Sequence, residues 1–304
     1  MKMFRFTGKY LWLFLGPTLA IITIFFIIPV FLTLLISFTD MDYAFEWNWI
    51  GLENYIRMLE DQWLPKILNN TFFYVFVTLT CFNVGMALVI SILTTHINEY
   101  VGSAFRAIWL LPRITPSTVY ALLWLWASRE DAMSLFNWIL GFFGMPPINW
   151  RLHQPWLLVI LVNGFVGVSF GMIIFTAALK SIPNDFLWAA QVDGASTFQV
   201  IRHVELPLIK WPILFVLAYQ TLSLLTSYEY ILLVTDGGPG FFTTEVWALR
   251  SYHLAFAQYG GRVYFGYGAA LSTILVVIGL IMSILYLKLF RFRELIIEPK
   301  IEVQ

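Results

Sequence analysis

Charged residues are scarce in this sequence. Of its 304 residues, only 12% are Asp, Glu, Lys or Arg, whereas 60% are hydrophobic and 18% are aromatic. Soluble proteins carry about 25% charged residues, so this chain has about half the usual supply for a surface that faces water. The composition excludes a soluble enzyme, a nucleic-acid-binding protein and a disordered chain, and it predicts a protein that lies in the lipid bilayer.

Other features are missing as well. Basic and acidic residues both number 18, so the formal net charge is zero and no polyanionic partner is implied. One cysteine, Cys81, excludes a disulfide framework within the chain, and the four histidines are too scattered to predict a metal site. No Gly-x-x-x-x-Gly-Lys-Ser/Thr sequence occurs, so we expect the chain to bind no nucleotide and no cofactor itself.

Uncharged stretches locate the membrane spans, because a spanning helix needs about 20 apolar residues. Four such stretches carry no charge, and two more carry one charge each, Arg113 and Glu229. The six predicted spans lie near 12–38, 71–95, 107–128, 156–179, 211–235 and 265–288. We therefore expect an all-α membrane protein whose residues 1–304 form a single transmembrane domain.

The distribution of Lys and Arg predicts the orientation, since these residues accumulate in cytoplasmic loops. With the amino terminus in the cytoplasm, the inner segments hold eleven basic residues and the outer ones six. The eleven are Lys2, Arg5, Lys9, Arg106, Lys180, Arg202, Lys210, Lys288, Arg291, Arg293 and Lys300. Both termini are therefore predicted to be cytoplasmic.

Residues 181–207 form the only inner loop of any size. Pro183 marks the start of a short helix, and Gly194 is suited to end it by adopting a positive φ. Ser196 and Gln199 have the spacing of a capping box, which opens a second helix that Pro207 limits. We predict two short helices at an angle, hinged at Asp193-Gly194.

This loop resembles the "EAA" loop of ABC importer permeases, whose pattern is Glu-Ala-Ala-x-x-Asp-Gly-Ala followed by Leu-Pro. In that family the loop is the coupling helix, which sits in a cleft of the cytoplasmic ATPase subunit. The matching residues are Ala189, Ala190, Asp193, Gly194, Ala195, Leu206 and Pro207. Trp188 stands where the family has its glutamate, and it substitutes bulk for charge. The alternative is a plain helical hairpin between two spans.

Three further segments are similar to carbohydrate-type permeases of the maltose and glycerol-phosphate kind, and to the first permease of the pair. They are Trp49–Tyr55, Leu233–Pro239 and Tyr264–Ser272. The resemblance implies a type I ABC importer permease fold in the inner membrane of a prokaryotic cell. It also implies a second homologous permease, an extracytoplasmic solute-binding protein that delivers a sugar, and two ATPase subunits that bind the ATP and Mg.

Span five carries a polar stripe. On a continuous helix with 100° per residue, its members fall within an arc of about 120°: Tyr219, Gln220, Ser223, Thr226, Ser227 and Tyr230. Such a stripe faces either a watery solute path or a neighbouring helix. Asn83 and Asn163 are further candidates for the path. We interpret Arg113 and Glu229 as side chains that reach the membrane interfaces, and Gly164, Gly167 and Gly171 as a close-packing surface.

The leading hypothesis is a permease subunit, not an enzyme, that imports a sugar through ATP hydrolysis by its partners. An ion-gradient-driven secondary transporter is the main alternative, although such proteins usually carry ionisable residues at mid-membrane. A permease for glycerol phosphate or another polar solute remains a second alternative, and Arg113 is the one base available to an anionic solute. A membrane enzyme ranks third, because no catalytic pair is evident.

Overall fold

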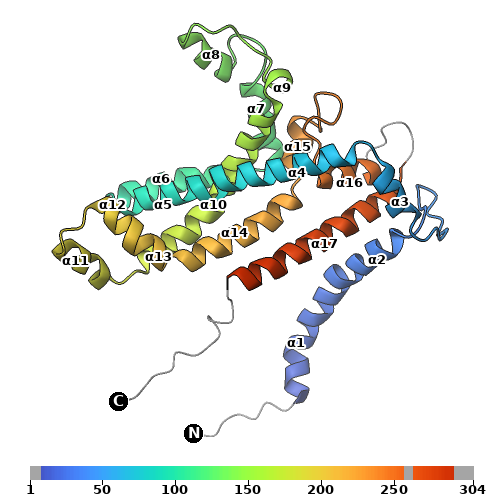
Figure 1. Cartoon of the computed structure of the whole chain (residues 1–304), viewed down its shortest axis with the longest axis horizontal. Coiled ribbons are helices and arrows are strands. Elements are labelled where there is room, and N and C mark those ends of the chain that lie inside the picture. Colours follow the sequence, from blue (N-terminus) through green and yellow to red (C-terminus); the bar gives the residue numbers. More distant parts are fainter. Residues whose placement is uncertain (1–7, 257–262, 291–304) are drawn as a thin grey trace. The chain divides into compact units, whose positions relative to one another are not determined.

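The computed structural model describes residues 8–256 and 263–290, which form helices joined by turns and loops (Figure 1). In these ranges there is no β-strand, and Thr39 and Trp49 form an isolated antiparallel bridge. The prediction of an all-α protein is confirmed. Five of the eleven basic residues that predict the orientation lie outside the described residues: Lys2, Arg5, Arg291, Arg293 and Lys300.

The chain divides into two compact units. Unit 1 comprises residues 1–62 and 250–276, and unit 2 comprises residues 63–249 and 277–304. The elements of unit 1 are α1 (Gly8–Ile22), the π-helix η1 (Thr23–Ile27), α2 (Ile28–Ile36) and α3 (Glu53–Glu60). Two helices have residues in both units: α16 (Trp247–Phe256) and α17 (Phe265–Leu289).

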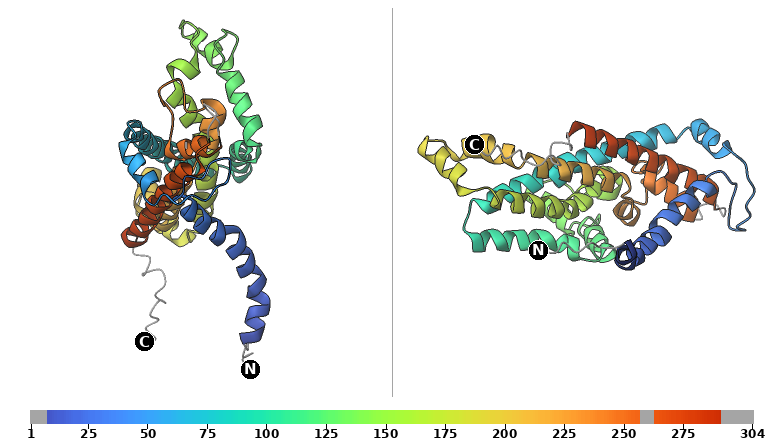
Figure 2. Two further views of the ribbon diagram at one scale, coloured as in Figure 1. Left: turned by 90° about the vertical axis from the view of Figure 1, so that its right-hand side faces the viewer. Right: turned by 90° about the horizontal axis from the view of Figure 1, so that it is seen from below.

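Unit 2 holds the remaining helices. In the first half they are α4 (Leu64–Thr78), the π-helix η2 (Leu79–Met86), α5 (Ala87–Thr95), α6 (Glu99–Ile114), α7 (Ser117–Ala127), α8 (Leu135–Phe142) and α9 (Trp150–His153). In the second half they are α10 (Pro155–Lys180), α11 (Asn184–Val192), α12 (Thr197–Val200), the π-helix η3 (Ile201–Glu205), α13 (Leu206–Leu208), α14 (Lys210–Leu225) and α15 (Glu229–Val234). Figures 1 and 2 show α5, α10 and α14 running alongside one another, with α11 projecting beyond their ends.

Within residues 8–256 and 263–290, four continuous helical stretches are long and apolar enough to cross a membrane. They are Trp12–Ile36, Leu64–Thr95, Pro155–Lys180 and Phe265–Leu289. These stretches correspond to the first, second, fourth and sixth predicted spans. The two predicted spans that carry a charge differ, because each is broken into two helices.

The third predicted span, near 107–128, is not one helix. It lies on α6 and α7, which are separated at Thr115 and Pro116. Thr115 has extended backbone angles (φ −77°, ψ 134°). The residue before a proline is disfavoured in the helical region, and the proline lacks the N–H that would continue the helix. Pro116 therefore causes the break. The mean hydropathy of the segment does not reveal it.

The fifth predicted span, near 211–235, is also broken. The helix α14 ends at Leu225, and α15 begins at Glu229. The Thr226 hydroxyl donates hydrogen bonds to carbonyls in the last turn of α14, and Tyr228 leaves the helical region with φ −134°. Hydroxyl side chains offer the backbone such alternatives to a continuing helix.

The helix α10 lies at the centre of unit 2. Buried side chains of α5, α10 and α14 form one core there: Ala87, Ile90, Val168, Met172, Phe175 and Val216. A Cβ on Gly164 would lie 2.4 Å from the Phe82 ring, and one on Gly167 would lie 2.0 Å from Oδ1 of Asn83. The predicted close-packing surface is therefore confirmed, and its partner is η2.

Candidate coupling surface and solute path

The two short helices predicted for residues 181–207, which we call the coupling segment, are present as α11 and α12. Gly194 lies in the turn between them with φ +75°, a region that favours glycine. Ser196 Oγ accepts a hydrogen bond from the Gln199 N–H, and Gln199 Oε1 accepts one from the Ser196 N–H. The predicted capping box is confirmed, and it fixes where α12 begins.

The continuous helical stretch that begins at Thr197 ends at Leu208, one residue after Pro207, so the second helix ends close to the limit predicted for it. Pro207 lies in α13, directly after the π-helix η3. The chain then bends by 66° between Thr197–Leu208 and Lys210–Leu225. Ile209, at the bend, is buried, so the direction of α14 is set where the coupling segment ends.

The coupling segment presents large apolar side chains to its surroundings. Among them, Phe186 is 52% exposed, Trp188 59% and Val192 88%. The remaining predicted coupling residues are exposed or half-buried: Ala189, Ala190, Asp193, Gly194, Ala195, Leu206 and Pro207. Exposed apolar patches of this kind mark interaction sites, and the small alanines permit close approach by another surface.

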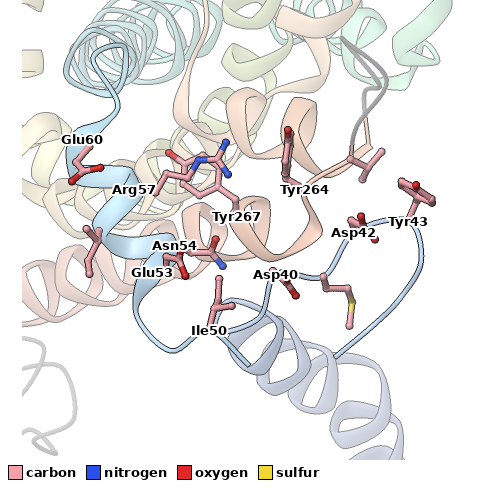
Figure 3. A pocket seen from close by; sticks show the side chains of 13 residues that line it. Asp40, Asp42, Tyr43, Ile50, Glu53, Asn54, Arg57, Glu60, Tyr264 and Tyr267 are labelled. Atoms are coloured by element: carbon pink, nitrogen blue, oxygen red, sulfur yellow. The ribbon is translucent and has the colours of Figure 1, made fainter. Parts of the chain in front are cut away.

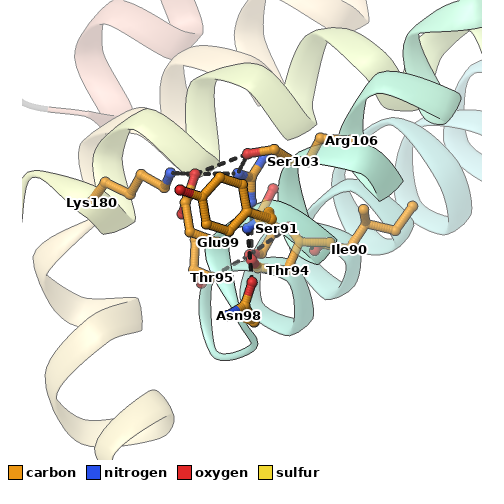
Figure 4. Close-up of polar contacts among 10 residues, drawn as sticks. Ile90, Ser91, Thr94, Thr95, Asn98, Glu99, Ser103, Arg106 and Lys180 are labelled. Carbon is orange, nitrogen blue, oxygen red and sulfur yellow. Dashed lines mark hydrogen bonds and ion pairs between the residues drawn. The ribbon is translucent and has the colours of Figure 1, made fainter.

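A charged network ties the helix ends beside the coupling segment. Oε1 of Glu99, in the first turn of α6, accepts hydrogen bonds from Lys180 (2.6 Å), Ser103 (2.9 Å) and Arg106 (2.9 Å) (Figure 4). Arg106 also donates to the Thr94 carbonyl at 2.9 Å. The hydrogen bonds from Lys180 and Ser103 lower the pKa of the Glu99 carboxyl below its ordinary value. The network joins the ends of α5, α6 and α10.

The two asparagines predicted for the solute path lie at helix–helix contacts. The Asn163 amide donates to Tyr74 Oη and, at 3.0 Å, to Ser227 Oγ. Asn83 is 1% exposed and packs against Gly167. Its Oδ1 has no hydrogen-bond partner within the described residues. Both side chains belong to the interior of unit 2.

The polar stripe of span five does not lie on one helix. Tyr219, Gln220 and Ser223 belong to α14, Thr226 and Ser227 follow its end, and Tyr230 lies on α15. The predicted arc of about 120° assumed a continuous helix, and the break after Leu225 removes that premise. Gln220 is buried and donates a hydrogen bond to the Gly167 carbonyl at 3.0 Å, so this residue of the stripe connects α14 to α10.

An aromatic platform adjoins the part of the stripe on α14. The Tyr219 ring is 4.5 Å from Phe170 and 6.3 Å from Phe215, centroid to centroid, with interplanar angles near 20°. The guanidinium of Arg113 lies 5.8 Å from the Phe170 ring. Phe170 and Phe215 were not predicted as site residues. The spacing of Phe215 and Tyr219, four residues apart on one helix, is the signal that identifies the platform.

Glu229 accepts a hydrogen bond from the hydroxyl of Ser117. Its carboxylate is exposed and lies in the first turn of α15, where it is favourably placed relative to the helix dipole. This local arrangement accounts for one of the two charges inside the predicted spans. The other, Arg113, is also exposed, and no ion pair of it occurs among the described residues.

Unit 1 contains a polar pocket of about 800 Å³ (Figure 3). The Arg57 guanidinium lies 5.0 Å and 4.7 Å from the ring centroids of Tyr264 and Tyr267. Four carboxylates also line it: Asp40, Asp42, Glu53 and Glu60. The pocket includes none of the side chains predicted for the solute path.

Comparisons with known proteins bear on the whole chain. The sequence profile of the family described as "binding-protein-dependent transport system inner membrane component" matches residues 84–293. The chain is 31% identical over 296 residues to the trehalose/maltose transport system permease protein MalF of Thermococcus litoralis, covering 94% of this chain and 95% of the relative. It is 28% identical to the diacetylchitobiose uptake system permease protein NgcF of Streptomyces coelicolor, covering 90% and 79%.

A solved structure has a similar fold. One chain of a bacterial ABC transporter involved in the import of the acidic polysaccharide alginate superposes with a TM-score of 0.79 at 21% identity, covering 93% of this chain and 95% of that chain. A second structure of an alginate ABC transporter, in complex with an alginate pentasaccharide-bound periplasmic protein, also superposes with a TM-score of 0.79. The fold is that of a type I ABC importer permease, as the resemblance implied.

Proposed function

The chain belongs to the family of binding-protein-dependent transport system inner membrane components, and from this premise we propose that it forms one half of the pore of an ATP-driven sugar importer. The observation that carries the proposal is the exposed coupling segment, with two short helices hinged at Gly194. It offers an apolar surface to a cytoplasmic subunit. Two partner ATPase subunits supply the energy and bind ATP and Mg, because the sequence lacks a phosphate-binding motif.

The proposed topology has six spans in a single membrane domain. Four are the continuous apolar stretches, and two are formed by the broken pairs α6–α7 and α14–α15. Both termini and the coupling segment lie in the cytoplasm of a prokaryotic cell, in agreement with the bias of Lys and Arg. A second homologous permease completes the pore, and an extracytoplasmic binding protein delivers the solute.

A sugar is the proposed solute because the relatives are named for trehalose/maltose and diacetylchitobiose transport. The aromatic platform of Phe170, Phe215 and Tyr219 supports this proposal. Flat rings pack against the apolar faces of a pyranose, and Tyr219, which is 48% exposed, adds a hydroxyl. The remaining stripe residues that are exposed, Ser223 and Thr226, complete the proposed path.

An acidic saccharide is a second candidate solute. Arg113 places an exposed cation beside the same platform, and a guanidinium binds carboxylates well. Replacing Arg113 by Gln distinguishes the two solute classes, because it should weaken uptake of a uronate oligomer and spare that of a neutral sugar. Equal effects on both would exclude a role for Arg113 in selecting the solute.

The test is purification of the chain with its co-expressed partner subunits, followed by a screen for sugars that stimulate ATP hydrolysis. The chain alone should show no ATPase activity. Replacing Asp193 and Gly194 together by Ala should leave hydrolysis but abolish uptake. Full ATP-driven uptake by that variant would contradict the assignment of the coupling segment. Uptake that survives ATP depletion but collapses with an ion gradient would instead identify a secondary transporter.

A further inference from the structure

One carboxylate of the coupling segment is buried against the end of the second long helix. Glu205, the last residue of η3, is 5% exposed, and its Oε1 lies 3.2 Å from Nε2 of His96, the residue that follows α5. Its Oε2 is buried and has no hydrogen-bond partner within the described residues. The His96 side chain is 31% exposed, and ion pairs in contact with solvent contribute little to stability, so fold stability does not explain this contact.

The geometry of the imidazole fixes where its protons lie. Nδ1 of His96 is 2.9 Å from the carbonyl of Ile92. A carbonyl only accepts, so Nδ1 carries a proton. Nε2 then binds Glu205 only when one further proton lies between them, either on Nε2 beside a carboxylate or on Glu205 as a carboxylic acid. Without that shared proton, a carboxylate faces the lone pair of Nε2, and the contact is lost.

This contact joins the coupling segment directly to the end of α5. The end of α5 is held against α6, since Arg106 donates to the Thr94 carbonyl and a Cβ on Gly102 would lie 2.3 Å from that oxygen. Over the described part of the chain, no other side-chain hydrogen bond or ion pair connects the coupling segment to α5. The contact therefore ties α5, and through it α6, to the segment that precedes the bend into α14.

Other charged groups near the pair are engaged elsewhere. Lys180 of α10 and Arg106 of α6 both bind Glu99. His203 of η3 directs its Nδ1 to the carbonyl of Gln199, one turn earlier in the same segment. Of the charged groups that the structure describes, His96 is therefore the one that acts directly on Glu205.

We propose that the His96–Glu205 pair is the link through which the coupling segment and α5 move together, and that Glu205 is a positioning residue for the coupling of ATP hydrolysis to transport. The inference rests on the proposed function. When the ATPase partner displaces the coupling segment, Glu205 moves with it. The hydrogen bond made by the shared proton then displaces His96 and the end of α5, which belongs to the second span. When the contact is absent, α13 and α5 remain linked only indirectly, through the shared core of α5, α10 and α14, so ATP is hydrolysed with less transport.

The experiment uses the full complex in proteoliposomes and measures sugar molecules transported per ATP hydrolysed. Glu205→Leu should lower this ratio about fivefold or more, the scale of a typical coupling energy. Glu205→Gln should keep the ratio, because its amide donates to a bare Nε2 or accepts from a protonated one.

A matched pair of histidine variants completes the test. His96→Phe should lower the ratio as Glu205→Leu does. His153→Phe should not, although His153 has the same Nδ1 contact with a carbonyl four residues earlier and is exposed. An unchanged ratio in Glu205→Leu or His96→Phe would overturn the link and leave the proposed function standing, as would a ratio in Glu205→Gln as low as that in Glu205→Leu. A wild-type complex without sugar-stimulated ATP hydrolysis would overturn both.

Discussion

The contact between α10 and η2 allows a quantitative prediction for Gly167→Ala. The added Cβ would lie 2.0 Å from Oδ1, 2.5 Å from Cγ and 2.8 Å from Nδ2 of Asn83, whereas ordinary contacts are about 3.5–4 Å. Asn83 is 1% exposed and has no space to retreat into. Either the helices separate by about 1 Å or more, or Asn83 leaves its rotamer, and overpacking of this kind costs about 1–3 kcal/mol.

Two smaller effects modify this estimate. Separation of the helices weakens the hydrogen bond from Gln220 to the Gly167 carbonyl, which contributes about 0.6 kcal/mol in a membrane protein. Alanine is a better helix former than glycine by about 1 kcal/mol. The net destabilisation of Gly167→Ala is therefore about 0.5–2.5 kcal/mol, measured as the free energy of unfolding of the detergent-solubilised chain in an SDS titration.

Gly141→Ala is the matched control. Gly141 also lies in a helix, α8, but no atom lies within 4 Å of the position its Cβ would occupy. This variant should be as stable as the wild type or up to about 1 kcal/mol more stable. If Gly167→Ala were as stable as Gly141→Ala, the close approach of α10 and η2 would be refuted.

Three further variants test other parts of the chain. Gly194→Ala forces a Cβ into a backbone with φ +75° and should cost about 1–2 kcal/mol, seen as faster proteolysis at the α11–α12 turn; unchanged cleavage would contradict the hinge geometry. Asn70→Ala removes three hydrogen bonds to carbonyls of residues 242–245, so amide hydrogen exchange should accelerate in that loop and nowhere else in unit 2. Because Lys180 lowers the pKa of Glu99, their link is fully present above the ordinary carboxyl pKa and is lost as the pH falls through the lowered one; Glu99→Gln should reduce the loss of thermal stability below the ordinary carboxyl pKa, and a profile equal to that of the wild type would exclude this role.

Local signals in the sequence predicted a large part of the coupling segment. The capping box of Ser196 and Gln199 and the positive φ of Gly194 depend on residues close together in the chain. Such interactions form wherever the segment is placed, so spacing and residue type suffice to predict them. The four uncharged spans could be predicted from the sequence equally well, because their helices need only length and hydrophobicity.

The solute path was harder to predict from the sequence. The stripe on span five was deduced from a helical period of 100° per residue, which holds only while the helix continues. Thr226 and Tyr228 interrupt it, and Gln220 turns toward α10 instead. Hydropathy averages over such breaks, since serine, threonine and proline change it little while they redirect the backbone. The platform of Phe170, Phe215 and Tyr219 combines two helices; the spacing of Phe215 and Tyr219 on α14 indicates part of it, but no periodicity within one helix reveals Phe170.

The sequence by itself determined that this chain lies in a membrane and that two short helices meet at Gly194 in residues 181–207. Scarce charge and local capping decide both, and neither needs distant contacts. Tertiary structure decided which polar groups meet across the chain. Glu205 and His96 are 3.2 Å apart although they come from separate helices, and Asn83 lies against Gly167. These pairings depend on how helices pack, and packing is set by the shapes of many side chains together.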